Sequence, residues 1–548
     1  MSQLPKLNTS RGREQKLEQL SPFELKDNLI KLADARHAHE QRSMLDAGRG
    51  NPNWTAVSAR EAFFALGIFA MRECKLDRDN PSGLGGVPQK SGIATRFYKF
   101  LQEEKGHPGI ELLTEIYKNG VRYFSPDVEE LIFEFTEGVV GSQYPQPVRM
   151  LHYCERVVRA FLLQELCAGK PPLSENYDLF ATEGGTAAMC YILDSLVENS
   201  LLKRGDKIAL GVPAFTPYIE MPQLDKYHFD VTYVYGSGKD ADGNPNYQYP
   251  ESELDKLGDK SVKAFFVINP SNPTSVMIDA ESRTYLVELV EKRNPSLMIL
   301  TDNVYGTFVE GFSSLMNDLP QNTISVYSFS KYFGCTGWRL GVIAMYHDNI
   351  YDKMLSELPQ QEKDRLAKRY ANLTVSPEKL KFIDRLAADS RDVALNHTAG
   401  LSTPQQIQMA LFAGFAVIDR MKEQSAYKKD CNALVQRRYN LFWEGMDIPV
   451  VPDPNRACYY CTFDVEDWAV KTYGKEFFAW LEKNFEPVDV VFRLAEECSV
   501  VVLNGGGFCG PEWSVRVSLA NLDSHEYKKL GRILSTILQE YVSAWKDK

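Results

Sequence analysis

Lys331 ends the stretch Ser328-Phe329-Ser330-Lys331 after a run of apolar residues, and Arg339 lies eight residues further on. A desolvated lysine is a nucleophilic amine, which can form a Schiff base with an aldehyde. The hydroxyl of Ser328 and the planar cationic fork of Arg339 suit a phosphate group. An aldehyde and a phosphate on one molecule indicate pyridoxal 5′-phosphate (PLP). The alternative interpretation is a strand-end lysine paired with a carboxylate.

A second phosphate-binding element precedes this motif in the segment TEGGTAA, residues 182–188. It opens a predicted helix, because apolar residues recur at helical spacing in TAAMCYILDSLV. Gly184 and Gly185 let the backbone approach a ligand closely, and Thr186 adds a hydroxyl. The free N–H groups and the positive end of the helix dipole would then meet the phosphate. A plain turn before a helix is the alternative.

A carboxylate stands at the end of the predicted strand LMILT, in the segment Asp302-Asn303-Val304-Tyr305. A buried charge is costly unless it is paired. The protonated pyridine nitrogen of PLP would suit Asp302, with an attraction of about 4 kcal/mol at an effective dielectric of about 20. This contact would keep the ring an electron sink, and Tyr305 could donate to its phenolic oxygen. A helix N-cap is the alternative role of Asp302.

Two further segments after predicted strands offer contacts to the ring. In NPSNPTS (269–275), two Asn-Pro steps make a rigid turn, and Asn272 can hydrogen-bond the same phenolic oxygen. In VPAFTPY (212–218), Phe215 can present its flat face to the ring. A surface turn and an ordinary core aromatic are the alternatives. Because all these motifs follow strands, we expect them at the edge of a parallel sheet where ligands bind.

The order TEGGTAA, PAFTPY, NPSNPTS, TDNVY, SFSKYFGCTGWR resembles the fold-type I PLP enzymes of the aspartate aminotransferase family, over roughly residues 180–345. The segment EWSVRVSLANL (512–522) looks like the C-terminal strand of that family, whose arginine clamps the substrate α-carboxylate. The resemblance therefore implies that Arg516 binds substrate by bidentate pairing, with Asn272 beside it. Ser275 departs from the family pattern, which usually has glycine after Asn-Pro-Thr.

The chain has 548 residues, more than the two domains of an aminotransferase need. Additional segments lie at about 74–137 and 352–392, where TRFYKFLQEEK, DVEELIFEFTEGVV and EKDRLAKRYANL are typical of helices. Together with SPFELKDNLIKLA, LDAGRGNPN and GSQYPQP, they resemble the L-aspartate β-decarboxylases over almost the whole chain. In that family two added helical motifs build a large oligomer from dimers. The resemblance implies such a homo-oligomer here, a dodecamer.

The same resemblance implies three further residues near the site. Arg49, between Gly48 and Gly50, would lie near the PLP and bind substrate. Tyr144 in GSQYPQP would reach the phosphate from across a dimer, and Lys26 would lie near the entrance. A surface arginine on a turn and a packed loop tyrosine are the alternatives for Arg49 and Tyr144.

The composition, with 44% hydrophobic and 25% charged residues, is that of a globular enzyme. A net charge of −11 argues against nucleic acid or an anionic membrane as a partner. No apolar run approaches about 18 residues, so no transmembrane helix is expected, and no signal peptide is recognised. The ten cysteines suggest reduced thiols in the cytoplasm. Cys458 and Cys461 have CxxC spacing, but one pair cannot fill a zinc site, and no metal is expected.

The alternation of strand, motif and helix from about 175 to 345 predicts an α/β fold, with a mainly parallel, seven-stranded-type sheet wrapped by helices. A smaller α+β domain should follow it. We expect 50–425 to form the large PLP-binding domain with its helical insertions, and 426–548 to form the small C-terminal domain. Residues 1–49 should form an N-terminal segment that packs with the small domain.

The expected function is PLP-dependent β-decarboxylation of L-aspartate to L-alanine and CO2, with a side activity that exchanges amino groups with 2-oxo acids. Lys331 would be both the anchor of the cofactor and the base that takes the Cα proton. The alternative is a plain aspartate or aromatic amino-acid aminotransferase. A PLP-fold scaffold without turnover is a second alternative, which the set of Lys331, Asp302 and Arg516 argues against.

Overall fold

The computed structural model describes residues 11–18, 20–40, 44–76, 84–124, 127–168, 176–391, 400–421 and 426–547. Its large sheet consists of β2 (Tyr177–Thr182), β3 (Lys207–Val212), β4 (Asp230–Tyr235), β5 (Val262–Ile268), β6 (Met298–Asp302), β7 (Thr323–Ser328) and β8 (Gly341–Tyr346). Their order is β2-β8-β7-β6-β5-β3-β4. The strands from β7 to β4 run parallel, and β8 is antiparallel to both of its neighbours. The predicted α/β fold with a mainly parallel sheet is confirmed.

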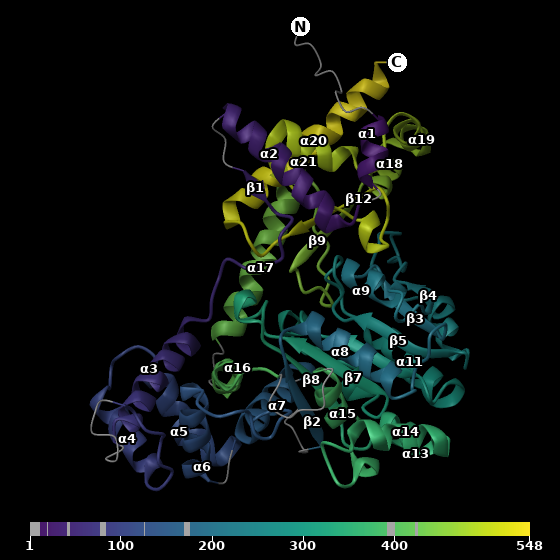
Figure 1. The fold of residues 1–548 in the computed structure, drawn as a ribbon. Helices are drawn as coiled ribbons and strands as arrows, with labels where there is room; N and C mark the ends of the chain where they lie inside the picture. The colour runs from purple at the N-terminus through teal and green to yellow at the C-terminus, as the bar shows by residue number, and fades with distance from the viewer. Residues whose placement is uncertain are drawn as a thin grey trace.

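Helices cover both faces of this sheet (Figure 1). The helices nearest to it include α7 (His152–Leu166), α8 (Gly185–Glu198) and α11 (Ala280–Arg293), and α16 (Thr403–Met421) packs on α7. Alternate residues of β5 point to opposite faces: Phe266 packs in the cluster of α8, whereas Phe265 packs in the cluster of α11. Strands buried on both faces explain why these segments are almost continuously apolar.

A second, three-stranded antiparallel sheet has the order β11-β12-β9. Its strands are β9 (Tyr460–Asp464), β11 (Leu503–Asn504) and β12 (Ser514–Ser518), and its helices include α17 (Ala426–Met446), α20 (Asp489–Cys498) and α21 (Ser524–Lys546). The N-terminal helix α2 (Pro22–Glu40) packs on α20, and β1 (Leu45–Asp46) pairs in parallel with β10 (Val500–Val501). Figure 1 shows α2 and α21, from opposite ends of the chain, together on this side. The domain boundaries drawn from the sequence stay predictions.

Both predicted insertions are helical. The first forms a lobe beside the large sheet, at the lower left of Figure 1; its helices are α3 (Val57–Cys74), α4 (Ile93–Glu103), α5 (Ile110–Tyr123) and α6 (Val128–Val140). Phe69 of α3 packs against Phe97 and Phe100 of α4, with ring centroids 4.9 and 5.3 Å apart. The second insertion consists of α13 (Ile350–Glu357), α14 (Gln360–Tyr370) and α15 (Phe382–Asp389).

The remaining elements are short or peripheral. They are the helices α1 (Arg11–Glu18), α9 (Thr216–Glu220), α10 (Glu251–Leu254), α12 (Leu315–Asp318), α18 (Val465–Tyr473) and α19 (Lys475–Asn484), and the 3-10 turns η1 (Met221–Gln223), η2 (Asp255–Gly258), η3 (Gly306–Phe308), η4 (Thr336–Trp338), η5 (Pro377–Lys379) and η6 (Gly506–Phe508). Among the helices of the described ranges, none combines the length and the apolar character that crossing a membrane requires.

Candidate active site

A cavity of about 490 Å³ lies where the carboxyl ends of the parallel strands meet the small sheet and the segment 48–51. Most of the predicted site residues line it: Arg49, Gly185, Thr186, Phe215, Asn272, Asp302, Tyr305, Ser328, Lys331, Arg339 and Arg516. The structure thus brings together residues that are spread over more than four hundred positions of the chain. The individual roles assigned to them above stay predictions.

Lys331 lies inside this cavity, and its Nζ donates a hydrogen bond of 3.0 Å to the carbonyl oxygen of Gly50 rather than to a carboxylate. Burial lowers the pKa of Lys331, and the positive charges of Arg516 and Arg339 act in the same direction, against Tyr460 and Asp302. A lowered pKa keeps more of the amine neutral, which is the form that attacks an aldehyde. The surroundings therefore favour the chemistry predicted for this lysine.

Asp302 is buried at the end of β6 and is held by two hydrogen bonds. The Tyr218 hydroxyl donates to its Oδ2 at 2.7 Å, and the Val304 N–H donates to its Oδ1 at 3.0 Å. Asp302 is not a helix N-cap, since the next helical turn begins at Gly306. Burial raises the pKa of Asp302, so a cationic partner in the cavity would stabilise its charged form.

Several donors gather at the end of the cavity where α8 begins. No side chain caps the N-terminus of α8, which leaves its first N–H groups available to a ligand. Gly184 does not line the cavity, but it has φ +101°, and a Cβ there would lie 2.5 Å from Nη2 of Arg339. Glycine at this position therefore lets the guanidinium approach the turn beside Ser328 and Gly185.

Arg516, on β12, is buried with its hydrogen-bonding capacity partly used. Its Nη1 donates to Oδ1 of Asn272 at 3.3 Å, and its Nη2 donates to the Gly48 carbonyl at 2.5 Å. Its Nε is buried without a partner among the described residues. The guanidinium carbon lies 4.4 Å from the ring centroid of Tyr460 and 5.1 Å from that of Phe508. A buried cation with a spare donor suits an anionic ligand such as a carboxylate.

The three residues implied only by family resemblance differ in their surroundings. Arg49 lines the cavity, but its side chain is half exposed and its Nε forms an ion pair of 2.8 Å with Asp46. Lys26 also lines the cavity and lies 3.9 Å from Asp27. Tyr144 is 66% exposed and is not part of the cavity wall of this single chain.

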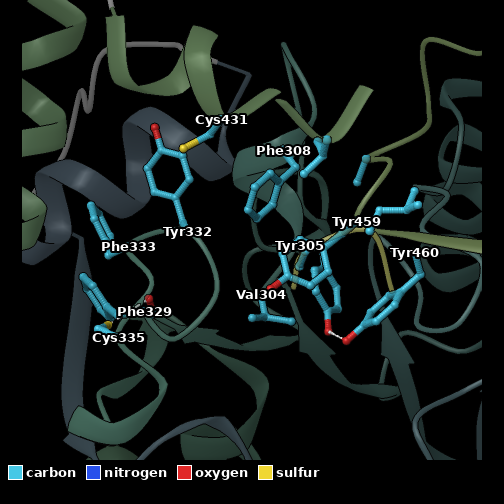
Figure 2. Packing of buried hydrophobic residues seen from close by; sticks show 14 of the residues in the cluster. Val304, Tyr305, Phe308, Phe329, Tyr332, Phe333, Cys335, Cys431, Tyr459 and Tyr460 are labelled. Atoms are coloured by element: carbon cyan, nitrogen blue, oxygen red, sulfur yellow. Dashed lines mark hydrogen bonds between the residues drawn. The ribbon is translucent and has the colours of Figure 1, made fainter. Parts of the chain in front are cut away.

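Two tyrosines of the cavity were not singled out from the sequence. Tyr218 supports Asp302, and the hydroxyl of Tyr460 shares a hydrogen bond of 3.0 Å with that of Tyr305 (Figure 2). The spacing of Tyr218 from Phe215 was a usable signal, because residues three apart in a helical turn share a face, and their rings are in contact. Tyr460 lies between the two cysteines of the CxxC segment, Cys458 and Cys461, whose thiols are both free and buried.

Ser275, the departure from the family pattern, has φ +57°, a backbone conformation that favours glycine. Its Oγ accepts a hydrogen bond of 2.8 Å from the N–H of Tyr460. Its carbonyl accepts another of 2.7 Å from the N–H of Ala457. The serine side chain thus adds a contact to the small sheet that glycine could not make.

The residues present fit PLP. Its phosphate would meet the start of α8, Ser328 and Arg339; its pyridine nitrogen would meet Asp302, and its aldehyde would meet Lys331. Tyr305 and Asn272, both buried, remain for the phenolic oxygen. In the part of the chain that the structure describes, no group of three or more His, Cys, Asp or Glu side chains could hold a metal ion.

The fold and the cavity define a PLP-dependent enzyme of the aminotransferase class. The profile of the family "aminotransferase class I and II" matches residues 169–534, and this chain belongs to that family. PLP dependence, predicted from Lys331 and its neighbours, is confirmed by this membership.

A curated relative from Pseudomonas sp. is a bifunctional aspartate aminotransferase and L-aspartate β-decarboxylase. It is 45% identical over 531 residues, which cover 97% of this chain and 98% of that protein. The predicted resemblance to this kind of enzyme is thereby confirmed.

Solved structures agree on the fold. Aspartate aminotransferase from Thermus thermophilus with maleate superposes with a TM-score of 0.57 at 16% identity, covering 97% of this chain and 100% of that one. An aromatic aminotransferase from Pyrococcus horikoshii gives 0.56 at 17% identity, covering 93% and 99%.

Proposed function

We propose that this protein removes the β-carboxylate of L-aspartate as CO2 to form L-alanine, and exchanges amino groups with 2-oxo acids as a side activity. The observation that carries the proposal is that, besides Arg339 at the phosphate end, two arginines line the cavity that holds Lys331: Arg516, and Arg49 with its partner Asp46. Two cations beside one amine match a substrate with two carboxylates. The full-length similarity to a bifunctional enzyme with both activities supports the same substrate.

The residues have distinct parts in this proposal. PLP, when bound, supplies an electron-accepting ring conjugated with the substrate nitrogen. Arg516 holds the α-carboxylate, and the amine of Lys331, whose pKa is lowered by burial, takes the Cα proton and returns it. Loss of CO2 leaves an electron pair on Cβ that must receive a proton. The segment around Gly50 covers Lys331 and would exclude water, which otherwise favours release of oxaloacetate.

We further propose a cytoplasmic homo-oligomer built from dimers, with the dodecamer implied by the family resemblance. The helix α3 carries an apolar stripe at Val57, Phe64, Ile68 and Met71, and Phe64 and Ile68 are 63% and 56% exposed. Exposed apolar patches of this kind mark interaction surfaces. The side chain of Tyr144 is 66% exposed, and in this oligomer it would complete the phosphate end of a neighbouring chain's cavity.

The test is an assay of the purified protein with L-aspartate and PLP, in which CO2, alanine and oxaloacetate are followed together. We expect alanine and CO2 in equal amounts and in excess of oxaloacetate. Oxaloacetate formed only when a 2-oxo acid is added, with no CO2, would instead assign a plain aminotransferase. No turnover under either condition would leave a scaffold function.

A further inference from the structure

Tyr460 connects the two ends of the cavity through direct contacts. The guanidinium of Arg516 lies over its ring at 4.4 Å, and its hydroxyl shares a hydrogen bond of 3.0 Å with Tyr305. Figure 2 shows the hydroxyls of Tyr305 and Tyr460 pointing toward one another. Tyr305 follows β6 of the large sheet, whereas Tyr460 begins β9 of the small sheet. Tyr460 therefore contacts both Arg516, to which we assign the substrate carboxylate, and Tyr305, to which we assign the phenolic oxygen of the cofactor.

The hydroxyl of Tyr305 has one proton and can donate to one acceptor. If that acceptor is the phenolic oxygen of PLP, Tyr305 can only accept from Tyr460. Both hydroxyls are buried, where chains of hydrogen bonds strengthen one another. Tyr460 would thus increase the donor strength of Tyr305, and through it the stability of the deprotonated phenolic oxygen of the cofactor.

The ring of Tyr460 faces the positive charge of Arg516, which a bound substrate carboxylate would partly neutralise. A cation over an aromatic face is attracted by the ring and makes its hydroxyl a better donor. A carboxylate bound to Arg516 would offset part of that charge and weaken the donor. Among the described residues, the other titratable groups that face these hydroxyls are Lys331 and Asp302, from the large sheet, and Tyr459, just before β9.

We propose that Tyr460 is a positioning residue that couples the occupancy of Arg516 to the hydrogen bond between Tyr305 and the cofactor. The proposal deepens the proposed function and rests on it in one respect, namely that Arg516 binds the substrate α-carboxylate. A second contact, from Nη1 of Arg516 to Asn272, runs beside this one. A substitution of Tyr460 can therefore remove its part of the coupling while the contact between Arg516 and Asn272 is kept.

The test is a pH titration of the visible absorption of the PLP-loaded protein, with and without succinate, a dicarboxylate that lacks an amino group. Tyr460→Phe keeps the ring over Arg516 and removes the hydroxyl. In this variant we expect the midpoint of the cofactor's absorption titration to rise by roughly 0.5 to 1 pH unit. A shift of this size is the equivalent of one buried hydrogen bond. The further rise that succinate causes in the wild-type protein should become smaller in the variant.

The matched control is Tyr351→Phe, which removes a buried hydroxyl that donates to the Asn322 carbonyl at 2.9 Å, away from the cavity. It should keep the wild-type midpoint and the wild-type response to succinate. If Tyr460→Phe also keeps both, the proposal is overturned. If Tyr460→Phe does not take up PLP, replacement of Tyr460 by 3-fluorotyrosine tests the proposal instead. That side chain keeps nearly the shape of tyrosine, and its hydroxyl is a stronger hydrogen-bond donor.

The fluorinated protein should titrate at a lower midpoint than the wild type, and an unchanged or higher midpoint would overturn the proposal. These measurements need bound PLP and a carboxylate at Arg516, but no turnover. A protein that fails to form CO2 and alanine and still shows the Tyr460 effect would refute the proposed function alone. A protein that decarboxylates aspartate and shows no Tyr460 effect would refute the inference alone.

Discussion

Asp302→Asn tests the electrostatic contact with the cofactor at nearly constant shape. A carboxylate and a pyridinium about 4 Å apart attract by about 4 kcal/mol at an effective dielectric of about 20. Because burial raises the pKa of Asp302, part of this attraction is consumed in deprotonating the carboxyl group. We therefore expect PLP to bind the variant roughly tenfold to a few hundredfold more weakly, since each tenfold change in affinity corresponds to about 1.4 kcal/mol.

The affinity can be measured by titrating the cofactor-free protein with PLP and following its absorption. Asp194→Asn is the matched control, because Asp194 also accepts a hydrogen bond from a tyrosine, Tyr227 at 2.5 Å, but lies outside the cavity. In the cofactor-free protein, Asp302→Asn should leave the unfolding midpoint unchanged or raised, since a buried charge is removed. A PLP affinity equal to that of the wild type would refute the pairing of Asp302 with the cofactor.

Three further predictions concern the anchor, the strained turn and the surface. Lys331→Ala should abolish alanine formation without unfolding the protein, as judged by circular dichroism; near-normal turnover would rule the lysine out. Ser275→Ala should lower the free energy of unfolding in urea by about 1 to 3 kcal/mol, because the Tyr460 N–H loses its acceptor while φ stays positive. Ser275→Gly should cost less, because glycine relieves the backbone, and the reverse order would contradict this account. Phe64→Glu with Ile68→Glu should yield smaller particles in sedimentation, and a wild-type particle of one dimer, twice 62.2 kDa, would contradict the predicted oligomer.

The cofactor end of the site was predictable because its residues follow strands of one parallel sheet. Asp302, Ser328 and Lys331 each stand at or just beyond the end of a strand, and such ends meet at one edge of the sheet. The antiparallel direction of β8 was not predicted. It arises because the chain turns back directly after Lys331 and pairs Gly341 with Ser328.

The contacts of Tyr460 could not be predicted from periodicity or spacing. Its partners Tyr305 and Arg516 lie 155 residues before it and 56 residues after it, and only the packing of two separate sheets brings them together. The ion pair of Arg49 with Asp46, three residues before it, was not predicted either, because the segment is not helical, and it offsets part of the charge of this arginine. The role of Tyr144 depends on a second chain and therefore stays a prediction.

The hydrogen bonds that Ser275 accepts, at its Oγ from Tyr460 and at its carbonyl from Ala457, belong to a longer row of bonds between the turn after β5 and the chain around the start of β9. Met277 N–H donates to the Asn455 carbonyl at 2.8 Å, and the Thr462 hydroxyl donates to the Pro273 carbonyl at 3.2 Å. Since Arg516 is paired with Thr462 across β12 and β9, these bonds also fix where Arg516 lies relative to the ends of β6 and β7, at which Asp302 and Ser328 stand. A displacement of the small sheet would therefore move Arg516 away from the cofactor-side residues of the cavity.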